Sequence, residues 1–188
     1  MKINATNLQI TEEQATDLCR TENNGLIGKL ADFFRGGSPA IEIIDVKQLY
    51  FPYYCTTVQL QLPKSRRIQQ SAMEANLVVD GVFGTVRGME GRPQTQKIEV
   101  ARSSVAKTRC SESQATEHVR KFVRKYLYRK FHAFPSFDSI SSTVVYKPLY
   151  AVQCQKKNKK YYQIVDAEMG CKDYTINFRY SEVQFHKG

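Results

Sequence analysis

The residues that could carry out acid–base or nucleophilic chemistry are few and widely spaced. The three histidines, His118, His132 and His186, fit no HExxH motif, and no serine lies in a nucleophile elbow. Histidines scattered in this way are typical of a protein surface or of a helix end. The sequence therefore predicts a protein that is not an enzyme, with no catalytic residue and no cofactor.

Two carboxylates, Asp80 and Asp166, precede similar turns and could pair as catalytic groups. An Asp before a turn glycine usually hydrogen-bonds the backbone of its own turn, and Gly81 follows Asp80 directly. We therefore interpret both aspartates as turn residues. An enzyme with Asp80 or Asp166 in a cleft remains a third hypothesis, which strongly raised carboxylate pKa values in a pocket would support.

The cysteines show no metal-binding pattern. Cys19, Cys55, Cys110, Cys154 and Cys171 form no CxxC pair, and no nearby histidine completes a zinc site. Because five thiols cannot all pair within one chain, we expect reduced cysteines and no bound metal. The chain as given has neither an export signal nor an apolar run long enough to cross a membrane, so we expect a soluble, cytoplasmic protein.

The composition is that of a folded protein with an uneven charge. The chain has 188 residues, of which 41% are hydrophobic and 24% charged, which excludes disordered and collagenous classes. The net charge of +10 comes from one half: residues 1–91 hold 9 Lys and Arg against 10 Asp and Glu, and residues 92–188 hold 19 against 8. Such an excess attracts nucleic acids, acidic proteins or anionic lipids.

Three sequence blocks occur twice in the same order. Residues 11–20 (TEEQATDLCR) match residues 111–120 (SESQATEHVR) at an offset of 100. Residues 49–54 match 145–150 at an offset of 96, and residues 78–84 match 164–170 at an offset of 86. We therefore predict two homologous units, residues 1–91 and residues 92–188, joined by a linker near residues 87–108.

Each copy begins with a capping box, Thr11 with Gln14 and Ser111 with Gln114, which predicts a helix start. The second helix should span about residues 112–131, because its apolar residues recur at helical spacing. The members of this expected apolar face are Ala115, Val119, Phe122, Val123, Tyr126 and Leu127. In the first copy we expect a break at residues 23–25 before the helix resumes at residues 26–34.

Strand patterns follow each helix. Residues 40–46 and 142–146 are rich in β-branched residues, and residues 55–62 and 151–155 continue after Pro52 and Pro148, which we expect to interrupt the strands. In the second copy, a hairpin turn at residues 156–160 should lead into a returning strand, with a final strand at residues 174–178. The predicted fold is α+β: two units, each a helix packed on an antiparallel meander of three or four strands.

The order of these motifs resembles the PepSY domain. The resemblance rests on the Gln-Ala helix start, on Tyr150-Ala151-Val152-Gln153, and on the hairpin that ends in Val165-Asp166-Ala167-Glu168-Met169-Gly170. It covers most of each repeat, but the first copy has Gly81 in place of Ala167 and a longer hairpin loop. The resemblance implies a module that faces outward from a membrane and binds or inhibits a protein partner.

Two sets of residues are candidates for binding. Cationic side chains on the second helix and in the hairpin could contact an acidic protein or an anionic surface: Arg120, Lys121, Arg124, Lys125, Arg129, Lys130, Lys156, Lys157, Lys159 and Lys160. Aromatic residues at repeated positions could form a ligand surface or belong to the core: Tyr50, Tyr53, Tyr54, Tyr146 and Tyr150.

The leading hypothesis is a non-enzymatic interaction protein whose basic second unit contacts an acidic protein or an anionic surface. The alternative is sequence-nonspecific binding of nucleic acid by the same helix and hairpin, with an affinity that falls steeply as salt is added. The partner and the oligomeric state stay open at this point.

Overall fold

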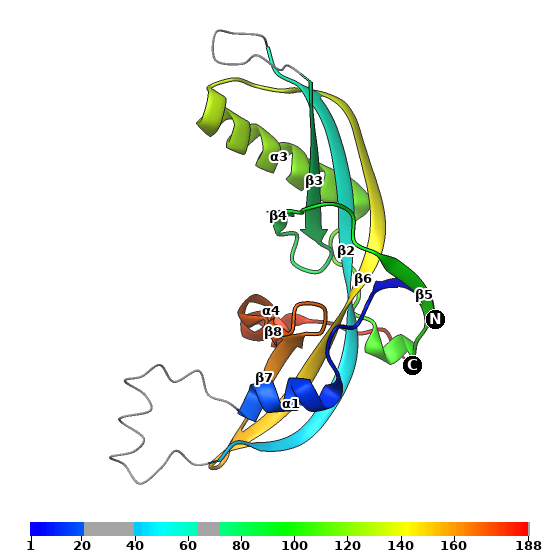
Figure 1. Cartoon of the computed structure of the whole chain (residues 1–188), viewed down its shortest axis with the longest axis vertical. Coiled ribbons are helices and arrows are strands. Elements are labelled where there is room, and N and C mark those ends of the chain that lie inside the picture. Colours follow the sequence, from blue (N-terminus) through cyan, green and yellow to red (C-terminus); the bar gives the residue numbers. More distant parts are fainter. Residues whose placement is uncertain (21–39, 64–71, 188) are drawn as a thin grey trace, which may run out of the picture. The chain divides into compact units, whose positions relative to one another are not determined.

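The computed structural model describes residues 1–20, 40–63 and 72–187, and it is a mixed α/β structure (Figure 1). Contacts divide the chain into two compact units. We call residues 1–6, 51–147 and 185–188 the α3 unit, and residues 7–50 and 148–184 the α1 unit. The predicted helix break at residues 23–25 and its continuation over residues 26–34 lie outside the described residues.

The α3 unit consists of one long helix on strands. It contains β1 (Lys2–Thr6), the later part of β2 (Glu42–Gln61), β3 (Ala72–Asp80), β4 (Val86–Gly88), β5 (Thr95–Glu99), the short helix η1 (Arg102–Ser104), α3 (Glu112–Phe131) and the first part of β6 (Ser136–Lys156). β2 and β3 pair antiparallel from Tyr53↔Asp80 to Gln61↔Ala72, and β4 extends β3 on its other side. The helix predicted for residues 112–131 is confirmed.

β1 and β5 pair antiparallel in the same unit, from Lys2↔Glu99 to Thr6↔Thr95. The predicted linker at residues 87–108 therefore contains a strand. Local sequence could not indicate this strand, because its pairing partner lies at the start of the chain.

The α1 unit repeats the helix-on-strands arrangement with other segments. It contains α1 (Glu12–Arg20), the first part of β2, the later part of β6, β7 (Lys159–Asp166), β8 (Cys171–Lys172), α4 (Tyr174–Arg179) and the short helix η2 (Tyr180–Glu182). β6 and β7 pair from Leu149↔Asp166 to Lys156↔Lys159, which confirms the predicted hairpin. Lys157, in its two-residue loop, has a φ of 55°.

The strand predicted at residues 174–178 is wrong, because these residues form α4. The carboxylate of Asp173 accepts a hydrogen bond of 2.9 Å from the amide of Ile176, which caps the helix at its first turn. This local bond outweighs the β-propensity of the aromatic and β-branched residues that follow.

The boundary predicted at residue 91 does not separate the two compact units. α1, from the first half of the sequence, packs on β6 and β7 from the second half, where Ala15 and Cys19 share a buried cluster with Val152 and Val165. Conversely, α3 packs on β2 and β3: its buried residues Ala115, Val119, Val123 and Leu127 share a cluster with Tyr54, Val58, Leu60, Leu77 and Val79. Each helix is thus covered by the hairpin of the other half.

The two prolines do not interrupt their strands, contrary to the prediction. β2 continues through Pro52 and β6 through Pro148, where each strand passes from one compact unit to the other. The ladders with β3 and β7 begin at the residues directly after the prolines, Tyr53 and Leu149. A missing amide donor is tolerated there because each proline stands just outside the ladder that follows it.

Candidate binding surface on helix α3

Helix α3 is held at its start and along one face. Ser111 accepts a hydrogen bond of 3.3 Å from the amide of Gln114, whose side chain accepts one of 2.8 Å from the amide of Ser111. The predicted capping box is therefore present. Val119 and Leu127 are buried against β2 and β3, so the helix presents a fixed outer surface.

The predicted apolar face is narrower than expected. Phe122 and Tyr126 remain 37% and 54% exposed. The neighbouring strand β4 has only three residues, and a Cβ placed on Gly88 would meet nothing within 4 Å. The sheet is too short at this edge to cover the side of the helix that carries the two aromatic rings.

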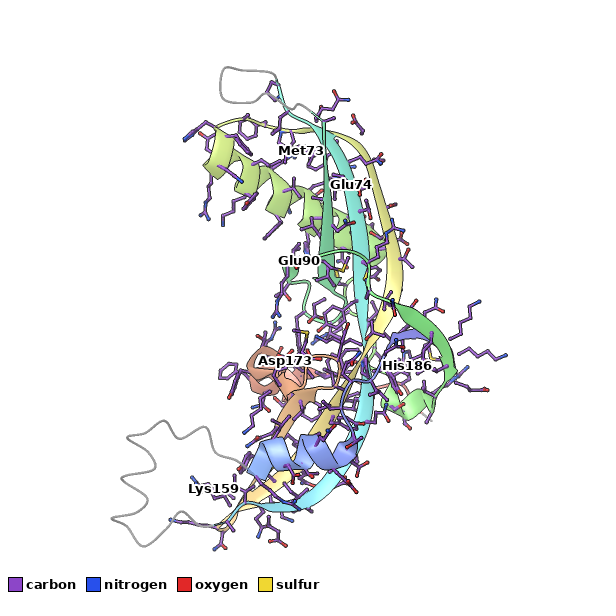
Figure 2. The ribbon with its side chains drawn as sticks, viewed as in Figure 1. Met73, Glu74, Glu90, Lys159, Asp173 and His186 are labelled. Carbon is purple, nitrogen blue, oxygen red and sulfur yellow. The ribbon has the colours of Figure 1, made fainter. Side chains whose placement is uncertain are left out.

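The uncovered strip is a groove of about 580 Å³ between α3 and the strands β3 and β4. Met73, Leu77, Met89, Glu90, Phe122 and Tyr126 are among its lining residues, so most of its surface is apolar. Figure 2 labels Met73, at the start of β3, and Glu90, after β4, which both border this groove. Sequence reasoning missed the groove, because the same apolar spacing is expected of a core helix.

The cationic side chains of α3 divide into groups with different contacts. The guanidinium groups of Arg120 and Arg124 lie 5.3 and 5.5 Å from the centre of the Phe137 ring, on the side of the helix towards β6. Lys121 forms an ion pair of 3.6 Å with Glu117. Three of the predicted binding residues, Arg120, Lys121 and Arg124, therefore contact other side chains of the protein itself.

The other three cations of α3 lie on the C-terminal half of the helix. The ammonium group of Lys130 lies 5.9 Å from the centre of the Tyr126 ring and 5.3 Å from that of Phe131. Lys125 and Arg129 are exposed. They stand three and seven positions after Phe122, which places them on the groove side of the helix.

The cationic hairpin belongs to the other unit. Lys156, Lys157, Lys159 and Lys160 surround the β6–β7 turn of the α1 unit (Lys159 is labelled in Figure 2). The α3 unit holds 18 Lys and Arg against 7 Asp and Glu, and the α1 unit holds 10 against 11, which together account for all 28 basic and 18 acidic residues. The hairpin is thus a local basic turn in a nearly neutral unit, and the basic field belongs to the α3 unit.

Most of the predicted aromatic surface is core. Tyr50, Tyr54 and Tyr150 are buried, with 8%, 5% and 5% of their surface exposed, so they offer no ligand platform. The Tyr54 hydroxyl donates a hydrogen bond of 2.8 Å to the carbonyl of Cys110, and burial raises the pKa of Tyr54. Tyr54 and Tyr150, which stand at matching positions of the two sequence blocks, each belong to a buried cluster.

The two remaining aromatic candidates are half-buried. Tyr53 lies under the ammonium group of Lys147, which is 5.9 Å from the ring centre. Burial raises the pKa of Tyr146. Neither ring is presented as an open surface.

The two aspartates bond their own turns, as predicted. One carboxylate oxygen of Asp80 accepts from the amides of Val82 and Phe83 at 2.7 and 2.9 Å. The corresponding oxygen of Asp166 accepts from the amides of Glu168 and Met169, both at 3.0 Å. Asp80 lies in the α3 unit and Asp166 in the α1 unit.

Of the histidines, His118 has a structural contact: its Nδ1 donates to the carbonyl of Gly84 across 2.9 Å. Within residues 1–20, 40–63 and 72–187, no group of three His, Cys, Asp or Glu side chains is arranged to hold a metal ion. In the same part of the chain, no helix is long and apolar enough to cross a membrane. Comparisons with protein-family models, with curated proteins and with solved structures find no match to this chain.

Proposed function

We propose that the protein is a non-enzymatic interaction protein and that the α3 groove binds an acidic segment of a protein partner. Apolar side chains of the segment lie against Phe122, Tyr126 and Met73. Its carboxylates face Lys125 and Arg129, beside the rings. The observation that carries the proposal is the exposure of two aromatic rings in the groove of a helix that carries Lys125 and Arg129 three and seven positions after Phe122, in the unit that holds all of the excess positive charge.

The chemistry of the groove favours a protein over a small polar ligand. Aromatic and methionine side chains, with an arginine at the margin, are the residue types enriched in protein interfaces. Charge complementarity then speeds association and selects among partners. Glu90 in the lining disfavours a partner that is acidic along its whole length, so we place the partner's carboxylates at the helix side of the groove.

The repeated sequence blocks support a role in binding. We propose that the two helix-and-meander segments are copies of one ancestral, PepSY-like module, and that the copies diverged in charge. Modules of the PepSY type are thought to bind or inhibit protein partners. Divergence of the copies accounts for the net charges of −1 in residues 1–91 and +11 in residues 92–188.

Charge reversal at the groove tests the proposal directly. The probe is a labelled peptide in which glutamates flank two leucines, and its affinity is measured by fluorescence anisotropy. We expect Lys125→Glu with Arg129→Glu to weaken binding at least tenfold. The control is Lys2→Glu with Lys97→Glu, which makes the same charge change in the same unit, at exposed positions of β1 and β5. If both variants lost the same affinity for the peptide, the interaction would be nonspecific charge attraction, and the proposed site would be wrong.

The apolar contribution is tested separately with Phe122→Ser and Tyr126→Ser, which change exposed side chains and keep the charge. We expect each to weaken binding of the leucine-containing peptide and to leave a peptide with serines in place of the leucines unaffected. Unchanged binding of the leucine peptide to both variants would contradict the proposal.

Nucleic-acid binding is the alternative for the same cations. A single-stranded oligonucleotide should bind weakly, because three of the six α3 cations contact Phe137 or Glu117 of the protein itself. Tighter binding of the oligonucleotide than of the acidic peptide, with an affinity that falls steeply with salt, would favour the alternative.

A further inference from the structure

Two cysteines from opposite ends of the sequence meet in the core of the α1 unit. Cys19, near the end of α1, and Cys154, in the later part of β6, are both fully buried and belong to one apolar cluster. Their thiols lie close enough to perturb each other's pKa, and the thiol of Cys154 also donates to the carbonyl of Val152 across 3.7 Å. One comes from the first repeat and the other from the second, so their contact exists only because the helices are exchanged.

The same position in the α3 unit is occupied by two valines. The repeat offsets of 100 and 96 place Val119 at the position of Cys19, and Val58 at the position of Cys154. Val119 and Val58 are also fully buried and also share one cluster. At these two corresponding positions, the α3 unit therefore has two valines and the α1 unit two cysteines. An apolar pair satisfies the packing, so packing alone does not require cysteine at either position of the α1 unit.

We propose that Cys19 and Cys154 form a redox-dependent disulfide that covalently joins the two halves of the chain. In the reaction, the two thiols lose two protons and two electrons as the sulfur–sulfur bond forms. A disulfide oxidant such as oxidised glutathione accepts them, its own sulfur–sulfur bond breaks, and two thiols of glutathione leave. In a reducing compartment the pair remains a dithiol, which is its state in the structure.

The burial of the pair determines when the bond forms. The contact between the two thiols, together with burial, raises the pKa of Cys19, and the same contact lowers the pKa of Cys154, so the thiolate of this pair is that of Cys154, whose sulfur is fully buried in the folded protein. An oxidant also cannot reach a fully buried sulfur. The disulfide therefore forms while the α1 unit is open, during folding or a large opening of α1, and once formed it is shielded from reductants.

A disulfide here closes a very long loop, from residue 19 to residue 154. Such a cross-link restricts the unfolded chain strongly and raises the unfolding temperature. It also holds α1 on β6 when the unit opens, so it preserves the exchanged arrangement of the halves. The remaining cysteines do not form a second pair of this kind: Cys110 lies in the cluster of the α3 unit, Cys55 is half-buried and Cys171 is exposed.

The test uses the full chain with Cys55, Cys110 and Cys171 changed to serine, so that the proposed pair alone is left. This protein is unfolded and refolded with oxidised or with reduced glutathione, and peptides are mapped by mass spectrometry without reduction. We expect a linked peptide containing Cys19 and Cys154 after oxidative refolding, and an unfolding temperature several degrees above that of the reduced protein. We expect the folded, reduced protein to react with the oxidant far more slowly than the refolding protein does.

The chain supplies its own control. Cys19→Val with Cys154→Val copies the pair found in the α3 unit, so this variant should fold, and its unfolding temperature should be the same in both glutathione conditions. If the refolded protein keeps both thiols free in oxidised glutathione, or carries only mixed disulfides with glutathione, the proposal fails. If serine at position 110 prevents folding, the same mapping on the unmodified chain identifies which cysteines are linked.

Discussion

The backbone amide of Cys110 donates a hydrogen bond of 2.9 Å to the carbonyl oxygen of Gly81. Cys110 stands directly before the cap of α3, and Gly81 lies in the turn after β3, so this bond fixes the start of α3 on the β2–β3 hairpin. The α1 unit contains the counterpart, in which the amide of Ile10, the residue before the cap of α1, donates to the carbonyl of Ala167 across 3.3 Å. In both units, a backbone bond therefore joins the residue before the helix to a turn of the hairpin on which the helix packs.

Because α1 packs on the β6–β7 hairpin and α3 on the β2–β3 hairpin, we predict that each half of the sequence folds only together with the other half. When residues 1–91 and residues 92–188 are produced as separate chains, each lacks the hairpin that covers its own helix, and buried residues such as Val119 and Leu127 become exposed. We expect the halves to combine in a one-to-one complex with the circular dichroism spectrum of the intact chain, as measured after mixing and size-exclusion chromatography. Two monomeric halves that each unfold cooperatively and do not associate would contradict the exchanged arrangement.

The turn aspartates should contribute similarly to stability. Asp80→Ala removes an acceptor shared by two amides in a buried turn, and hydrogen bonds to charged groups contribute about 1.5–3 kcal/mol. We expect Asp80→Ala and Asp166→Ala each to lower the free energy of unfolding by about 2–3 kcal/mol in urea titrations. The Asp80→Asn control keeps an oxygen acceptor and should lose less. If Asp80→Ala lowered the free energy of unfolding by less than Asp80→Asn does, these hydrogen bonds would not stabilise the turn.

Gly84 is constrained by its backbone and by its surroundings. Its φ of 71° favours glycine, and an added Cβ would lie 2.7 Å from Cε1 of His118. Gly91 has a similar φ of 73° and no atom within 4 Å of such a Cβ. We expect Gly91→Ala to cost about 1 kcal/mol from backbone strain alone, and Gly84→Ala to cost a further 1–3 kcal/mol, roughly, from overpacking. Thermal unfolding of both variants measures the difference, and equal losses would indicate that the imidazole moves aside at no cost.

Tyr180 should make stability depend on pH at the alkaline end. Burial, together with the nearby Tyr162 and Asp45, raises the pKa of Tyr180 from 10.0 to about 12. Above a pH of about 10, the phenol of Tyr180 loses its proton in the unfolded state before it does so in the folded state. The contribution of Tyr180 to the free energy of unfolding is therefore fully present below pH 10 and is lost as the pH rises towards 12. Phenolate absorbance should show a late-titrating tyrosine that is missing in Tyr180→Phe, and this variant should lose less stability over that interval. If the absorbance curves of the two proteins coincide, Tyr180 titrates as an ordinary tyrosine.

Short-range sequence signals predicted the local structure well. Ser111 and Gln114 indicated the start of α3, and the apolar spacing indicated its extent to residue 131. Asp80 and Asp166 were identified as turn residues, and the hairpin at Lys157 and Asn158 was placed correctly. Each of these features depends on bonds between residues a few positions apart, so the types of neighbouring residues determine them.

The sequence by itself thus determined where α1, α3 and the two aspartate turns begin, and which half carries the excess positive charge. Only the tertiary structure decided that α1 packs on β6 and β7 and α3 on β2 and β3, because the matching sequence blocks of the two halves carry similar apolar patterns in their helices and in their strands. The local sequence patterns are compatible with either arrangement, in which a helix packs on the hairpin of its own half or on the hairpin of the other half. The exposure of Phe122 and the meeting of Cys19 with Cys154 follow from that choice of partners, which depends on packing between segments far apart in the chain.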